Sequence, residues 1–111
     1  MKLEQTRHGA STVISIHGAL VNEELTKLSD AIDESLGLGA TKLVLELSEV
    51  PFVDSAGLEL LLDLISRIGK LGGEIRLAAL NEVCREIFSA TRMDNFYHLF
   101  EDADSALRSM A

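Results

Sequence analysis

Residues 43–62 read LVLELSEVPFVDSAGLELLL, an apolar run followed by a connector and a leucine-rich segment. The run from Leu43 to Leu47 is short and almost continuously apolar, which is typical of a central strand covered on both faces. Leucine and isoleucine then recur at helical spacing from about Ser55 to Leu71, where Gly72-Gly73 follows. The stretch therefore predicts a buried strand, a loop and an amphipathic helix.

The segments on either side of this stretch alternate between strand and helix patterns. Further strands are expected at Leu3–Arg7, Thr12–His17, Glu74–Ala78 and Phe96–Phe100. Further helices are expected after the capping residues Asn22, Asn81 and Asp102. This order predicts an α/β fold with a mixed sheet, parallel in its centre and closed at one edge by an antiparallel hairpin, with about four helices packed on it. Since no repeat or linker divides the chain, we expect a single domain over residues 1–111.

Composition and charge narrow the classes of partner. The 18 acidic and 10 basic residues leave a net charge of −8, which argues against nucleic acid or an anionic membrane, because phosphate binding needs clustered Lys and Arg. The single Cys84 predicts neither a disulfide nor a zinc cluster, and favours a cytoplasmic location. The N-terminus shows no apolar leader, and no stretch approaches the roughly 20 apolar residues of a membrane span. We expect no cofactor and no membrane insertion.

Asp54 and Ser55 stand where the leucine-rich helix is expected to begin. Either side chain can accept hydrogen bonds from the free backbone N–H groups there, so either residue can be the N-cap. The helix dipole also tolerates a phosphate on Ser55, and that phosphate would add about −1.5 to −2 charge beside Asp54. Gly57 lowers helix propensity in the first turn. The close approach of another chain or a nucleotide would explain why a glycine stands there.

The apolar residues of this helix fall into two sets. One broad apolar face is expected to comprise Leu58, Leu61, Leu62, Ile65 and Ile68. Three more leucines lie outside that face: Leu60, Leu64 and Leu71. Burial against a neighbouring helix accounts for the second set, and so does an exposed apolar flank that docks a partner.

Two other classes, one catalytic and one signalling, lack their motifs here. A serine hydrolase needs a Gly-x-Ser-x-Gly elbow, but Val53 stands two residues before Ser55. The three histidines, on or beside predicted strands, read as surface or edge-strand residues rather than catalytic bases: His8, His17 and His98. A response-regulator receiver domain needs an acidic pair after its first strand, and the first strands here end in Thr6-Arg7 and Ile16-His17. We therefore expect no enzyme activity.

Three segments together resemble one known family. Gly18-Ala19-Leu20 precedes the first helix, Phe52-Val53-Asp54-Ser55-Ala56-Gly57-Leu58 joins the central strand to the second helix, and Gly72-Gly73 precedes the strand that begins at Glu74. With this order and spacing the chain resembles, over essentially its whole length, the STAS domains, and specifically the bacterial anti-sigma factor antagonists. Asp-Ser-Ala-Gly-Leu alone would be a weak signal, and its position between that strand and that helix makes it a strong one.

The resemblance implies a regulator that acts by partner switching. Its unphosphorylated form would bind a serine kinase that has a histidine-kinase-like ATP-binding fold and serves as an anti-sigma factor. Phosphorylation of Ser55 would release that kinase, and a PP2C-type phosphatase would restore the unphosphorylated form. The partner-binding residues implied are Asn22, Asp54, Ser55, Ala56, Gly57, Leu58, Glu59, Leu60 and Leu64.

Two positions depart from the family pattern. Val21-Asn22 stands where the family often carries an acidic residue, and Asn22 is the polar residue available there to fill its role. Glu46-Leu47-Ser48 replaces the common Asp-Leu-Ser at the end of the central strand. The alternative within interaction proteins is a constitutive STAS scaffold, or an accessory subunit of a lipid transporter, without a phosphorylation switch.

Overall fold

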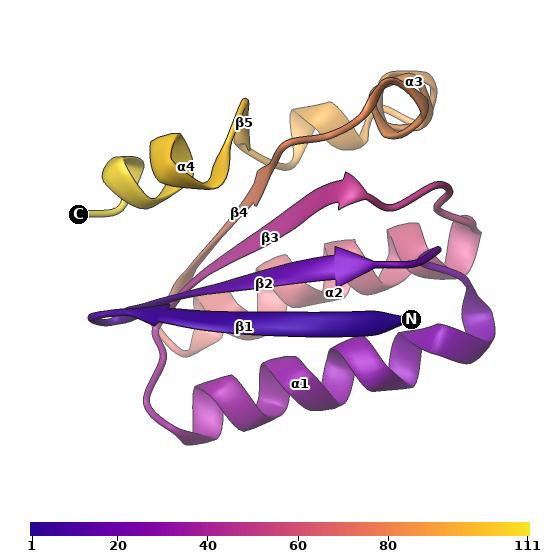
Figure 1. Ribbon diagram of the computed structural model, residues 1–111. Helices are drawn as coiled ribbons and strands as arrows, with labels where there is room; N and C mark the ends of the chain where they lie inside the picture. Colours follow the sequence, from indigo (N-terminus) through magenta and orange to yellow (C-terminus); the bar gives the residue numbers. More distant parts are fainter.

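The computed structural model describes residues 1–111, and its elements follow the predicted order (Figure 1). The strands are β1 (Lys2–His8), β2 (Ser11–His17), β3 (Lys42–Glu49), β4 (Glu74–Ala78) and β5 (Leu99–Phe100). The α-helices are α1 (Leu25–Gly37), α2 (Ser55–Lys70), α3 (Glu82–Ala90) and α4 (Ala103–Ser109). Two short 3₁₀ helices, η1 (Asn22–Glu24) and η2 (Met93–Asn95), precede α1 and β5. No helix combines the length and the apolar character that crossing a bilayer requires.

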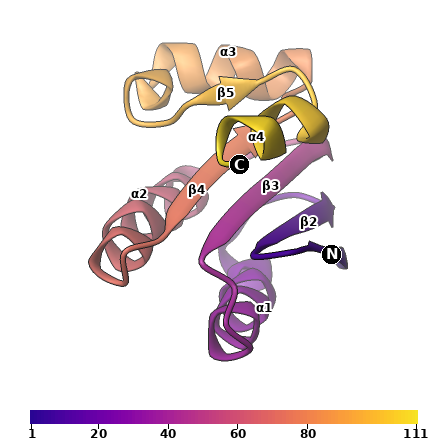
Figure 2. The same ribbon diagram turned by 90° about the vertical axis from the view of Figure 1, so that its left-hand side faces the viewer.

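The five strands form one sheet in the order β1-β2-β3-β4-β5. β1 pairs antiparallel with β2, and every other neighbouring pair is parallel, which confirms the predicted mixed sheet with its hairpin at one edge. Helices α1 and α2 lie on one face of the sheet and α4 on the other (Figures 1 and 2). The parallel strands all end at the same edge, which carries the loops that lead into α1, α2 and α3.

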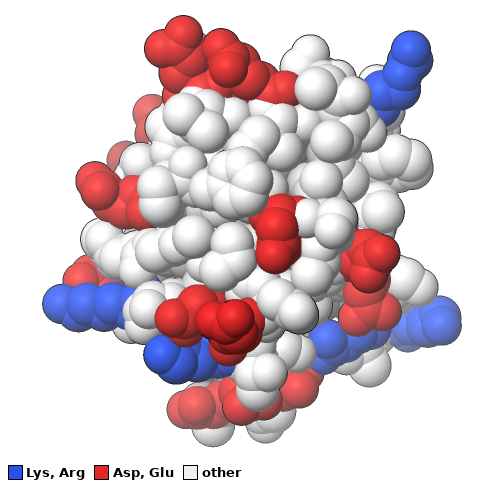
Figure 3. Space-filling view, turned by 90° about the vertical axis from the view of Figure 1, so that its right-hand side faces the viewer, with Lys and Arg blue, Asp and Glu red and all other residues white.

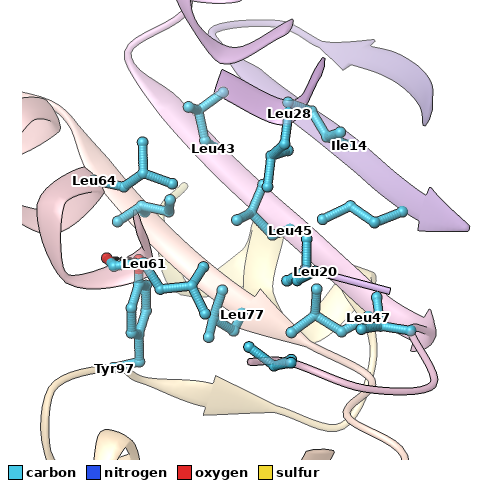
Figure 4. Close-up of a cluster of buried hydrophobic side chains, with 14 of the residues drawn as sticks. Ile14, Leu20, Leu28, Leu43, Leu45, Leu47, Leu61, Leu64, Leu77 and Tyr97 are labelled. Atoms are coloured by element: carbon cyan, nitrogen blue, oxygen red, sulfur yellow. Dashed lines mark hydrogen bonds between the residues drawn. The ribbon is translucent and has the colours of Figure 1, made fainter. Parts of the chain in front are cut away.

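Alternate residues of β3 supply both cores of the domain. Leu43, Leu45 and Leu47 are fully buried in the larger cluster beneath α1 and α2 (Figure 4). Val44 points to the opposite face, where it packs in a smaller cluster with Ala106 and other apolar residues. The predicted burial of this strand on both faces is therefore confirmed, and its near-continuous apolar sequence follows from it.

The predicted strand Phe96–Phe100 is wrong except at its end, since only Leu99 and Phe100 pair with β4. The residues before them turn away because Tyr97 directs its side chain beneath α2, where its hydroxyl donates to the Leu61 carbonyl at 2.7 Å (Figure 4). Aromatic content alone suggested a strand, whereas burial of this one ring takes the backbone out of the sheet. Burial also raises the pKa of Tyr97 well above its ordinary value.

The helix caps predicted at Asn81 and Asp102 are confirmed. The Asn81 side chain accepts a hydrogen bond from the Cys84 N–H at 2.9 Å, and Asp102 accepts one from the Ser105 N–H at 2.7 Å. The second bond holds the pKa of the Asp102 carboxyl below its ordinary value, because it stabilises the ionised form. Each cap satisfies an N–H group that helix geometry leaves unpaired.

We expect Tyr97→Phe to lower the free energy of unfolding by about 1 kcal/mol at neutral pH, through loss of one buried hydrogen bond. Because the folded pKa lies above the ordinary value of 10.0, Tyr97 contributes full stability below that pH, and this contribution falls as the pH rises above it. Urea titrations of both proteins between neutral and strongly alkaline pH measure the difference. An identical alkaline loss of stability in the variant would contradict the assignment, since this is the single tyrosine.

Candidate functional site

Two loops meet at the edge where the parallel strands end. The loop after β2 runs beside the loop after β3, and Leu20 forms a parallel β-bridge with Val53. The Leu20 N–H donates to the Phe52 carbonyl at 2.9 Å, and the Asp54 N–H donates back to the Leu20 carbonyl at 3.1 Å. The Gly18–Leu20 turn and the connector before α2, far apart in sequence, therefore form one hydrogen-bonded unit.

The Asp54 side chain holds this unit to the start of α2. One carboxylate oxygen accepts from the Gly57 N–H at 2.8 Å, and the other accepts from the Asn22 N–H at 3.1 Å. Asp54 is therefore the N-cap of α2, and it also binds the backbone of η1. The prediction that the Asn22 side chain caps the first helix is wrong: Asn22 is the first residue of η1, and only its backbone N–H takes part.

Ser55 is the first residue of α2, and its side chain is exposed. Because Asp54 supplies the cap, the Ser55 hydroxyl is not needed for it and makes no hydrogen bond within the chain. Of the two capping readings, the structure selects Asp54. Ser55 thus presents a free hydroxyl at the positive end of a 16-residue helix, where an added anion meets favourable backbone dipoles.

Gly57 is required by the chain's own backbone. A Cβ atom at this position would lie 2.4 Å from the Leu20 carbonyl oxygen and 2.9 Å from Val53. The predicted close approach is therefore real, but the approaching group is the neighbouring loop rather than a partner or a nucleotide. The Leu20 carbonyl cannot move aside freely, because it accepts the hydrogen bond from the Asp54 N–H.

The contact at Gly57 also sets which face of α2 is buried. Gly57, Leu61, Leu64 and Ile68 point inward, whereas Leu62 is 40% exposed. The buried face is thus rotated from the predicted one by a little under a quarter of a turn, about 70° at 100° per residue. Gly57 has no side chain and therefore adds nothing to a hydrophobic pattern. The pattern consequently placed the centre of the buried face too far toward Leu62.

Burial separates the predicted partner-binding residues into two groups. Ser55, Glu59 and Asn22 are exposed, and four more are partly exposed: Asp54, Ala56, Leu58 and Leu60. Gly57 and Leu64 are buried inside the domain and offer a partner no surface, so they serve the fold instead. The sequence did not decide whether Leu60, Leu64 and Leu71 are buried or form an exposed flank. In the structure Leu64 is buried and Leu71 is 66% exposed.

Two apolar residues beside Ser55 were not predicted as site residues. Phe52, in the loop before α2, is 50% exposed, and Leu62 lies two turns along the face that Ser55 begins. Phe52 belongs to the segment that carries the family resemblance, and an aromatic residue in a loop next to the motif was the available signal. Leu62 had no such signal, because its exposure depends on the rotation of α2.

The surface around Ser55 is acidic. Four exposed glutamates lie at or near this edge: Glu23 in η1, Glu49 at the end of β3, Glu59 in α2 and Glu82 at the start of α3. Figure 3 shows this side of the molecule, with acidic side chains spread over its face, one of them near the middle, and with Lys and Arg toward the periphery. Lys27 bonds Glu24 at 3.1 Å and lowers the pKa of that carboxyl.

No three His, Cys, Asp or Glu side chains are grouped to hold a metal ion.

Comparison with known proteins identifies the family. The profile of the STAS domain matches residues 2–106, and the chain belongs to this family. It is 28% identical over 78 residues, 70% of this chain and 69% of the other, to a Thermotoga neapolitana protein named as a candidate anti-sigma factor antagonist.

Solved structures of anti-sigma factor antagonists share the fold. One from Mycobacterium paratuberculosis is 25% identical with a TM-score of 0.85, over 97% of this chain and 92% of that one. Unphosphorylated SpoIIAA is 17% identical with a TM-score of 0.81, over 98% and 96% of the two chains. A phosphorylated form of SpoIIAA from Bacillus, also 17% identical, superimposes with a TM-score of 0.74, over 99% and 100%.

The capping arrangement predicts opposite outcomes for two adjacent residues. Asp54→Ala removes the acceptor of two backbone hydrogen bonds, and we expect it to lower the free energy of unfolding by about 1–2 kcal/mol. Ser55→Ala removes no hydrogen bond and is expected to change it by less than about 0.5 kcal/mol. Urea denaturation measures both, and a larger loss from Ser55→Ala than from Asp54→Ala would overturn the assignment of the cap.

Two glycines of α2 provide a matched pair. We expect Gly57→Ala to destabilise the protein by about 1–3 kcal/mol, because the new methyl group overlaps a carbonyl that is itself hydrogen-bonded. Gly69→Ala places its methyl group where nothing lies within 4 Å, and is expected to stabilise by about 0.5–1 kcal/mol through helix propensity. Thermal and urea denaturation of both variants test this, and the same sign for the two would refute the close approach at Gly57.

Proposed function

We propose that this protein is an anti-sigma factor antagonist that binds a kinase-type anti-sigma factor and releases it when Ser55 is phosphorylated. The observation that carries the proposal is the free, exposed hydroxyl of Ser55 at the start of α2. The membership of the STAS family and the names of its relatives support the class of partner. In this proposal a PP2C-type phosphatase restores the unphosphorylated form, and the protein itself catalyses no reaction.

The proposed binding surface is the exposed face of the first two turns of α2, together with the loop before it. It comprises Phe52, Ser55, Ala56, Glu59, Leu60 and Leu62. Phe52 lies three residues before Ser55 and Leu62 about two turns after it, and their exposed parts supply apolar area for a contact that excludes water. A hydroxyl fits such a contact, because it is small and uncharged.

A phosphate on Ser55 would leave the fold intact and act on the complex. Backbone N–H groups at the start of α2 favour an anion, so the isolated domain tolerates it. Glu59 lies one turn away, Asp54 is adjacent, and no Lys or Arg lies within four residues of Ser55 along the chain. In a dry contact about two added negative charges would meet a desolvation cost and like-charge repulsion, and both weaken binding.

We expect mass spectrometry of the protein from its own cells to find phosphate on Ser55. In pull-downs, Ser55→Ala should retain a partner with a histidine-kinase-like ATP-binding domain, and Ser55→Asp should reduce its capture at least about tenfold, as desolvating an unpaired charge costs about 1.4 kcal/mol or more. Ser66→Asp is the matched control, since Ser66 is exposed on the same helix about three turns away and its variant should bind normally.

The opposite results would refute the switch. If Ser55 is never modified and the Ala and Asp variants capture the same partners equally, the protein is a constitutive binding module. Capture of a membrane transporter in place of the kinase would favour the accessory-subunit function. Equal loss of binding by the Ser55→Asp and Ser66→Asp variants would show that the charge on α2, and not its position, determines the effect.

A further inference from the structure

The first residues of β4 have no neighbouring strand on one side, so the sheet has an open edge there. The strand pairs with β3 along its whole length, from Glu74 to Ala78, but with β5 only through Leu77 and Ala78. Because the segment before β5 turns inward with Tyr97, no strand covers the outer side of residues 74–76. Figure 2 shows β4 between α2 on one side and β5 on the other.

A cavity of about 220 Å³ borders this open edge. Ile65 and Ile68 of α2 and Ile75 of β4 form much of its apolar wall, together with Phe96, which is 59% exposed. Its polar lining includes Arg76 and His98 as well as Glu74. The cavity therefore joins an apolar wall to the Arg76–Glu74 ion pair, so that a small ligand would find both apolar contact and a charged group there.

The guanidinium group of Arg76 is incompletely bonded. Its Nη1 donates to the Ile75 carbonyl at 3.1 Å, and its Nη2 donates to Glu74 at 3.3 Å, which is long for a charge-assisted bond. Its Nε is buried and has no acceptor within the chain. The edge formed by Nε and Nη2 therefore carries one long hydrogen bond, whereas a carboxylate facing it squarely would accept two.

We propose that this cavity binds a small apolar carboxylate that accepts from Nη2 of Arg76 and, once the Glu74 side chain has turned away, from Nε as well. Its hydrocarbon part packs against Ile65 and Ile68. The ligand carboxylate replaces that of Glu74, which is 42% exposed on its side chain and can turn into water. A free acid and the C-terminal residue of a peptide share this chemistry, since each joins a carboxylate to a short apolar group.

The test uses N-acetylleucine and N-acetylleucinamide, which have the same hydrocarbon body but differ in charge, added to the full chain and followed by amide NMR. We expect N-acetylleucine to shift the signals of Ile75, Arg76 and His98 saturably, with a Kd of about 1 mM for a ligand of this size. The amide should bind at least about tenfold more weakly, because it lacks the charge that the guanidinium edge pairs with. A capped tripeptide ending in leucine binds more tightly if the ligand is a peptide terminus, and no more tightly if it is a free acid.

Three variants keep the result specific. Arg76→Met should abolish the saturable shifts, while Arg108→Met, at an exposed arginine bonded only to Ser105, should leave them unchanged. Gly69→Leu adds a side chain at the α2 wall of the cavity and leaves Arg76 in place; since its Cβ meets no atom within 4 Å, this variant tests the site even if Arg76→Met fails to fold. Equal binding of acid and amide, binding that survives in Gly69→Leu, or no shift at about ten times the expected Kd would overturn the proposal.

Discussion

The two hydrogen bonds that the Asp54 carboxylate accepts determine the geometry of the sheet's C-terminal edge. Through the N–H groups of Gly57 and Asn22 this one side chain joins α2 to the segment that leads into α1. Hydrogen bonds to an ionised acceptor are stronger than neutral ones, so a single residue can hold two otherwise separate loops. With Asp54 as the cap, the hydroxyl of Ser55 remains available at the surface.

The close packing of Gly57 against Leu20 adds a rotational constraint to that cap. Because no side chain separates helix from loop, α2 turns until Leu61, Leu64 and Ile68 face the core and Leu62 faces outward with Ser55. The same helix then presents Ile65 and Gly69 to the cavity beside β4. One rigid element thus contributes to two surfaces of the domain, the proposed docking face at its start and the proposed carboxylate site at its end.

Charge has a different role at each of these places. The net charge of −8 lies in part on glutamates around the start of α2, and no Lys or Arg lies within four residues of Ser55 along the chain to bind a phosphate. In the proposed switch the new charge therefore acts chiefly between molecules, since the helix dipole offsets its local cost. At the cavity the unusual feature is the buried Nε of Arg76, which has no partner within the chain. Buried polar groups in proteins seldom lack a hydrogen-bond partner.

The amino-acid sequence by itself determined the order of elements, the mixed sheet, the caps at Asn81 and Asp102, and the motif that assigns the chain to its family. These features depend on local spacing and on residues close in sequence, so a linear pattern contains them. Only the tertiary structure decided that Asp54 rather than Ser55 caps α2, that Leu64 is buried and Leu62 exposed, and that Phe96 and Tyr97 lie outside the sheet. The burial of α2 and the course of the chain at Tyr97 depend on contacts between segments about 30 or more residues apart, such as Gly57 with Leu20 and Tyr97 with Leu61, which no local pattern encodes. The cap was left open by the sequence because two adjacent side chains could both accept the hydrogen bond.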